Sequence, residues 1–112
     1  MVRQILLICI GLCCLPAAAI GQSEPAHSYT PPNGFVPDSL TAVRIAVAVW
    51  GPIYGEAAIR NEEPFHASLK NDIWTVTGSL PAPPPGMESV GGVALAEIAK
   101  KDGRVIRVSH GK

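Results

Sequence analysis

The body of this sequence contains no cysteine. Its three cysteines, Cys9, Cys13 and Cys14, all lie within the first fourteen positions. The residues beyond position 14 therefore cannot form a disulfide scaffold, a cysteine-ligated zinc site or a thiol nucleophile among themselves. We therefore expect a hydrophobic core alone to hold the fold together.

Long apolar runs are also absent. The longest covers residues 5–15, between Arg3 and Pro16, whereas a membrane-spanning helix needs about 20 apolar residues. The first 21 residues have the pattern of a secretory signal peptide. They begin with a short cationic segment, continue with a short apolar stretch and end with mostly small residues at 17–21. We expect cleavage after Gly21, export to the periplasm or envelope, and no stable membrane insertion of the mature chain.

Charged residues are scarce and balanced. They make up 16% of the chain, with nine lysines plus arginines against nine acidic residues. Loss of Arg3 with the signal peptide leaves a net charge near −1. The densest basic cluster is Lys100-Lys101, and binding to a phosphate backbone needs a far more concentrated basic surface. We therefore do not expect nucleic acid as a partner.

Motifs for cofactors, phosphate or metal are missing as well. The sequence has no Gly-x-Ser-x-Gly, no phosphate-binding loop and no dinucleotide fingerprint. The three histidines, His27, His66 and His110, lie far apart, with no second ligand at helical or hairpin spacing. We expect no metal, no cofactor and no enzymatic activity.

The residues after the signal peptide suffice for one domain. Residues 22–34 are rich in proline and poor in apolar side chains, which indicates a flexible tether. The folded domain is expected to span residues 35–112.

The first part of this domain has the periodicity of a helix. Asp38, or the serine after it, is a residue type that caps a helix N-terminus. Apolar residues then recur every three or four positions up to Tyr54. The pair Gly51-Pro52 should bend or interrupt this helix, because proline cannot donate to the preceding turn. A short second helix is expected over residues 56–61.

The second half has the two-residue period of strands. The expected strands cover residues 65–69, 73–77, 93–99 and 104–110. Turns at Asn71-Asp72 and at residues 100–103 separate neighbouring strands, as does the proline-rich loop at 81–86, which cannot join a ladder. We predict an α+β fold in which the N-terminal helix packs on a curved four-stranded antiparallel sheet.

Three large aromatic residues are candidates for the core or for a pocket. Trp50 and Trp74 are expected to face each other between helix and sheet, since aromatic residues dominate cores of this size. Tyr54 is the best candidate for the rim of a concave pocket, because its phenol needs a polar partner or water.

A binding site for a protein partner is expected on exposed loops of the scaffold. Pro83, Pro84 and Pro85 stiffen the loop at 81–87. A stiff loop loses little entropy on docking, which makes these prolines candidate contact residues.

Glutamates are the other candidates for that site. Glu62, Glu63 and Glu88 could form an acidic rim that attracts a basic partner. The alternative, that they only keep the surface soluble, stays open. Glu62 and Glu63 are adjacent in a polar loop, so both are expected to face water, and Glu97 is expected to be a solvent-facing strand residue.

Several short segments between Phe35 and Lys112 carry a resemblance to a known family. They are Val36-Pro37-Asp38, Thr41-Ala42, Ile45-Ala46, Trp50, Pro52-Ile53-Tyr54-Gly55, Pro64-Phe65, Leu69, Trp74-Thr75-Val76-Thr77-Gly78-Ser79-Leu80, Gly91-Gly92, Ile98-Ala99-Lys100-Lys101-Asp102-Gly103-Arg104-Val105 and His110-Gly111-Lys112. In this order and spacing they resemble the immunity proteins with a nuclear-transport-factor-2-like fold. The resemblance implies a protein that protects bacteria by binding a polymorphic toxin, which an exported member would meet outside the cytoplasm. The proline-dense loop at 81–85 and the export signal lie outside the pattern.

Two other functions stay open. One is a periplasmic small-ligand binder or minor enzyme that uses the pocket between helix and sheet, since folds of this cone-like kind often have such a pocket. The other is a structural component of the envelope, which would assemble without a toxin or a ligand.

Overall fold

The computed structural model describes Gly11 and residues 27–112. The expected signal peptide therefore lies, except for Gly11, outside the described residues, as does the expected tether up to residue 26. Among the described residues, no helix is long and apolar enough to cross a membrane.

The first helix, α1 (Ser39–Tyr54), begins where the sequence predicts. Asp38 caps it: its Oδ1 accepts hydrogen bonds from the Thr41 amide (2.8 Å) and from Thr41 Oγ1 (2.7 Å). Both bonds lower the pKa of Asp38 below its ordinary value of 3.8, and the bond from the hydroxyl has the larger effect.

The sequence predicts a bend or an interruption at Gly51-Pro52. The interruption is wrong, because α1 continues through Pro52 to Tyr54. Pro52 lies in the last turn, so its missing N–H removes only one bond near the helix end. The Gly55 amide then donates to the Gly51 carbonyl at 2.8 Å and closes that turn. Gly55 has φ +95 and separates α1 from α2 (Glu56–Arg60), which confirms the expected short second helix.

The sheet has the predicted composition and order. Its strands are β1 (His66–Lys70), β2 (Ile73–Thr77), β3 (Ala94–Ala99) and β4 (Val105–His110), paired antiparallel in the order β1-β2-β3-β4. Asn71 and Asp72 both have positive φ, +51 and +60, as the tight two-residue hairpin turn requires. A register shift between Glu97 and Ile98 interrupts the β3–β4 ladder.

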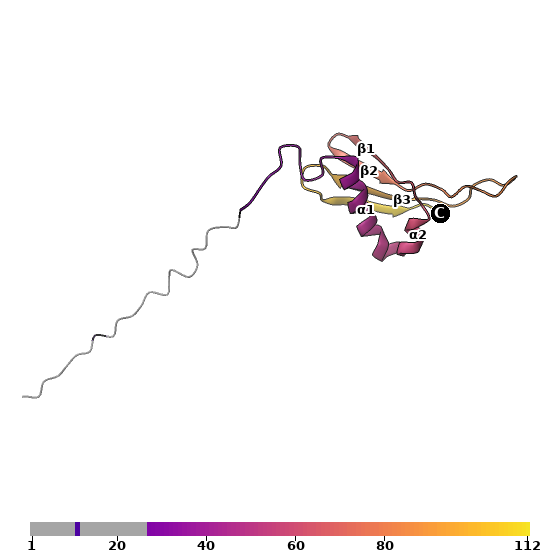
Figure 1. The fold of residues 1–112 in the computed structure, drawn as a ribbon, viewed down its shortest axis with the longest axis horizontal. Coiled ribbons are helices and arrows are strands. Elements are labelled where there is room, and N and C mark those ends of the chain that lie inside the picture. Colours follow the sequence, from indigo (N-terminus) through magenta and orange to yellow (C-terminus); the bar gives the residue numbers. More distant parts are fainter. Residues whose placement is uncertain (1–10, 12–26) are drawn as a thin grey trace, which may run out of the picture.

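The helix lies across one face of the sheet, which confirms the α+β architecture (Figure 1). The core between them is formed by Val36, Ala42, Ala46, Trp50, Ile59, Trp74, Val76, Ala94, Ala96 and Ile98. Both tryptophans are buried, as predicted, and each indole N–H has a carbonyl partner. Trp50 donates to Leu95 O (3.2 Å) and Trp74 to Val36 O (2.8 Å), so neither ring leaves an unsatisfied polar atom in the core.

The chain before α1 packs on the turn that joins β3 to β4. The Phe35 amide donates to Lys101 O and the Val36 amide to Lys100 O, both at 3.0 Å. Gly34 has φ +81, and a Cβ there would lie 2.5 Å from the Lys100 carbonyl oxygen. Glycine is therefore required at this close approach, and the end of the expected tether is fixed to the domain.

Candidate binding site: a proline-rich arm and its base

A long exposed segment joins β2 to β3. We call residues 79–93 the arm, and it projects past the end of the sheet (Figure 1). Every residue from 80 to 91 is exposed. Three apolar side chains are among them: Leu80 (41% exposed), Met87 (65%) and Val90 (86%). Exposed apolar side chains gathered on one projecting segment are typical of a binding element.

The tip of the arm is a tight turn. The Met87 amide donates to the Pro84 carbonyl at 3.0 Å, and Gly86 between them has φ +79. Proline at the second position and a positive-φ glycine at the third are the signature of a type II turn. The two limbs also touch lower down, where Ser89 Oγ donates to Pro81 O at 3.4 Å.

The base of the arm is fixed by main-chain hydrogen bonds. The Gly78 amide donates to Ala94 O at 3.0 Å, which joins the two limbs where they leave the sheet. The Ser79 amide donates to Glu62 O at 2.7 Å, and the Gly111 amide to Val93 O at 3.1 Å. The base is therefore held by the loop after α2 and by the C-terminus as well as by the sheet.

Glu62 stands at the centre of this base, and its expected exposure to water is wrong. Its residue exposure is only 7%. One carboxylate oxygen, Oε1, accepts a hydrogen bond from the Ala94 amide at 2.7 Å, and the other, Oε2, lies 2.9 Å from His110 Nε2. A Cβ on Gly78 would lie 2.5 Å from Oε1, so the carboxylate fits only because residue 78 is glycine.

The burial of Glu62 follows from a helical turn that continues past α2. The Glu62 amide donates to Ile59 O at 2.9 Å. Residues three apart in such a turn share a face, and Ile59 is in the core with 1% exposure. The three-residue spacing between Ile59 and Glu62 was the signal in the sequence for the burial of Glu62. Its neighbour Glu63 faces water, as expected.

His110 completes the base, and the arrangement favours its charged form. Its Nδ1 lies 2.7 Å from Gly111 O while its Nε2 faces Glu62. Both neighbours, the Gly111 carbonyl and the Glu62 carboxylate, are hydrogen-bond acceptors, so each ring nitrogen must carry an N–H. Only the protonated imidazolium form has an N–H on both nitrogens. The bond to the Gly111 carbonyl, followed by the bond to Glu62, raises the pKa of His110 above its ordinary value of 6.5. The Tyr54 ring packs against it, with ring centroids 5.0 Å apart.

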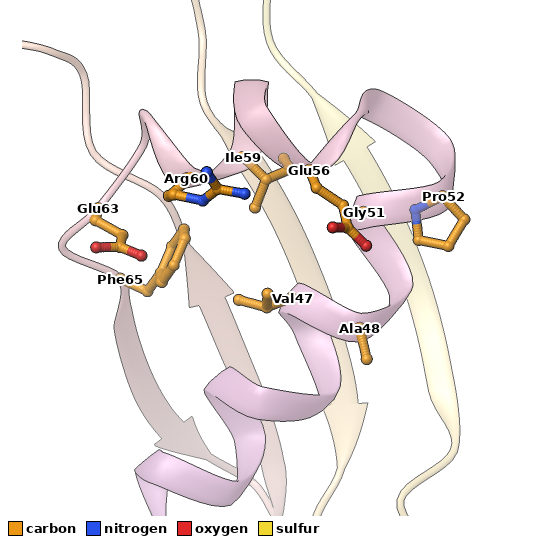
Figure 2. A pocket seen from close by; sticks show the side chains of 9 residues that line it. All are labelled: Val47, Ala48, Gly51, Pro52, Glu56, Ile59, Arg60, Glu63 and Phe65. Carbon is orange, nitrogen blue, oxygen red and sulfur yellow. The ribbon is translucent and has the colours of Figure 1, made fainter.

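A separate groove lies between α1, α2 and the start of β1. It has a volume of about 450 Å³. Its lining is Val47, Ala48, Gly51, Pro52, Glu56, Ile59, Arg60, Glu63 and Phe65 (Figure 2). The charged side chains of Glu56, Arg60 and Glu63 are all exposed, so the groove presents no acid or base sheltered from water.

The candidate residues from the sequence therefore fall into different places. Pro83, Pro84, Pro85 and Glu88 lie together on the arm, and Tyr54 lies beside its base against His110. Glu63 lines the groove. Because Glu62 is buried, the three glutamates do not form one acidic rim.

The other titratable groups in the described part of the chain form no cluster of metal ligands. No group of three or more His, Cys, Asp or Glu side chains there could hold a metal ion. Glu97 lies opposite Arg107 on β4 and pairs with it, with Oε1 2.7 Å from Nη2. The arginine side chain is 55% exposed, as expected for an ion pair on the solvent side of the sheet.

The comparisons with known proteins agree with this fold. Residues 41–112 match the profile of a family described as NTF2 fold immunity protein, a span that includes nearly all of α1 and every later element. The chain belongs to the NTF2 fold immunity proteins. The matched residues include the arm, its base and the groove.

One relative of known sequence is the uncharacterized protein YhhH of Escherichia coli (strain K12). The two chains are 30% identical over 89 residues, which cover 80% of this chain and 66% of YhhH. The chain thus spans slightly less than two thirds of that relative. No solved structure matches the chain.

Proposed function

We propose that this chain is an exported immunity protein that neutralises a bacterial toxin by stoichiometric binding and without turnover. The observation that carries the proposal is the family match over residues 41–112. Immunity implies a cognate toxin as partner.

The shape of the chain supports the same function. The arm offers exposed apolar surface on a base that is fixed by several hydrogen bonds. A preorganised binding element loses little conformational entropy when its partner docks. We propose that the arm makes the toxin contact. We also propose, from the export signal expected at residues 1–21, that the two proteins meet in the periplasm or envelope.

A growth assay with a matched control tests this function. The full chain and a version without residues 1–21 are expressed beside each secreted or surface-displayed toxin candidate of the same bacterium. With the cognate toxin directed to the periplasm, we expect the full chain to restore viable counts and the leaderless version to fail. The purified pair should form a 1:1 complex by light scattering.

Three outcomes would contradict the proposal. If neither the full chain nor the leaderless version protects against any of the candidate toxins, the immunity function is ruled out. Equal protection by the leaderless version against a cytoplasmic toxin would keep immunity and remove export. Assembly of the chain into large envelope complexes without a toxin would instead favour a structural role.

The groove supports a second candidate function, a periplasmic small-ligand binder. Its apolar floor and charged edge would suit a small amphipathic molecule. Ala48 lines the groove and is exposed, so Ala48→Phe should fill it without disturbing the core. A ligand that raises the melting temperature of the native chain and not of this variant would favour the second function.

A further inference from the structure

The outgoing limb of the arm has a backbone conformation set by its prolines. Leu80, Ala82, Pro83 and Pro84 each precede a proline, and a residue before proline is forced into the extended or polyproline II region. Each proline fixes its own φ near the same helix. These restrictions favour a short polyproline II segment that ends at the type II turn.

This segment presents two proline rings at the spacing that protein grooves recognise. Pro81 and Pro84 form a P-x-x-P pattern. Polyproline II has three residues per turn and a rise of about 3.1 Å, so these rings share one edge and lie about 9 Å apart. Domains that bind P-x-x-P segments use grooves lined by aromatic side chains.

The described part of the chain leaves this edge uncovered. Residues 80–84 are all exposed. The contacts that hold them are made by main-chain carbonyls, Pro81 O with Ser89 Oγ and Pro84 O with the Met87 amide. Both bonds leave the faces of the proline rings free to pack against a partner.

The base fixes the direction in which the segment points. Glu62 accepts hydrogen bonds from the amide of Ala94, the first residue of β3, and from the amide of Ser79 at the start of the outgoing limb. A stiff segment on a fixed base is already in the conformation that a groove would accept, and this lowers the entropy lost on binding.

We propose that residues 80–84 are a polyproline II ligand that docks into an aromatic-lined groove on the protein partner, with Pro81 and Pro84 filling neighbouring slots. This inference rests on the proposed function, since the partner is the toxin. Glu88 is the only charged residue of the arm, so the groove is expected to have a basic residue beside it.

The first experiment uses probes that do not require the toxin. The full mature chain, labelled with ¹⁵N, is titrated with purified SH3, WW and EVH1 domains, which have aromatic-lined grooves. We expect saturable amide shifts confined to the arm, at Ala82, Gly86 and Met87, with at least one domain. The double variant Pro81→Ala/Pro84→Ala should weaken that binding at least tenfold.

The matched control is Pro32→Ala, an exposed proline in the tether, which should bind like the native chain. Unchanged melting temperatures would show that the fold is intact in both variants. Absence of arm shifts with all three domains, or equal binding by the double variant, would overturn the inference.

The second experiment separates this inference from the proposed function. In the growth assay, the double variant should lose protection while Pro32→Ala retains it. Full protection by the double variant would overturn the inference and leave immunity intact. If the native chain protects against no toxin, immunity fails, and the titration still decides whether the arm is a polyproline II ligand.

Discussion

Replacing Glu62 by alanine tests whether the base of the arm is organised by one buried carboxylate. The Ala94 amide, which donates to it at 2.7 Å, would lose its acceptor in a buried position. His110 would lose its ion-pair partner as well, but its side chain is 31% exposed and can be solvated. The loss at Ala94 should therefore dominate.

The expected magnitude follows from that loss. A hydrogen bond to a charged group contributes about 1.5–3 kcal/mol, and an unsatisfied buried donor costs a similar amount. We expect Glu62→Ala to lower the free energy of unfolding by about 3 kcal/mol. In a domain of this size, 3 kcal/mol corresponds to roughly 12–24 °C in melting temperature.

Thermal and urea unfolding followed by circular dichroism measure this effect. Glu63→Ala is the control, because this neighbour is exposed and its loss should change stability by less than about 0.5 kcal/mol. Glu62→Gln should fall between the two, since the amide oxygen can still accept from Ala94. A loss below about 1 kcal/mol for Glu62→Ala, or equal effects of the two alanine variants, would refute the reasoning.

Three further predictions concern the base and the core. The raised pKa of His110 means that its stabilising contribution is complete below the ordinary value of 6.5 and disappears as the pH rises through the raised value. Urea midpoints of the native chain and of His110→Gln should therefore converge at alkaline pH, and a gap that stays constant with pH would contradict this. Gly78→Ala should displace Glu62, because Oε1 would lie 2.5 Å from the new Cβ. The substitution should therefore lower the free energy of unfolding less in a Glu62→Ala background than in the native chain, and additive losses of stability would refute the clash. Trp74→Phe should lower the free energy of unfolding in urea by about 2 kcal/mol, because Val36 O loses its donor at 2.8 Å. An unchanged free energy would show that this bond does not hold the segment before α1.

Much of the fold could be predicted from the sequence because its signals are local. Alternating apolar residues placed β2 at its observed bounds, and two turn-forming residues at 71–72 placed the hairpin before it. The helix start followed from Asp38 as a cap. These patterns depend on neighbours within a few positions, so no tertiary contact is needed to interpret them.

The errors arose where the outcome depends on position within an element or on distant residues. Pro52 does not stop α1, because it lies in the last turn where few bonds remain to break. Glu62 is buried by partners 32 and 48 positions away. Its spacing from Ile59 is a local sign of the face on which it lies, but no local pattern identifies these two distant partners. Two adjacent glutamates can thus differ in burial, because the helical turn points one side chain toward the core and the other toward water.

The Gly78–Ala94 hydrogen bond closes the ladder below the arm. Insertions or deletions between these two residues would leave the core untouched, and lengthening a surface loop adds only a small closure entropy. The length and sequence of this segment can therefore change while the scaffold beneath it stays constant. Exchanging the segment between relatives would then transfer partner choice from one protein to another.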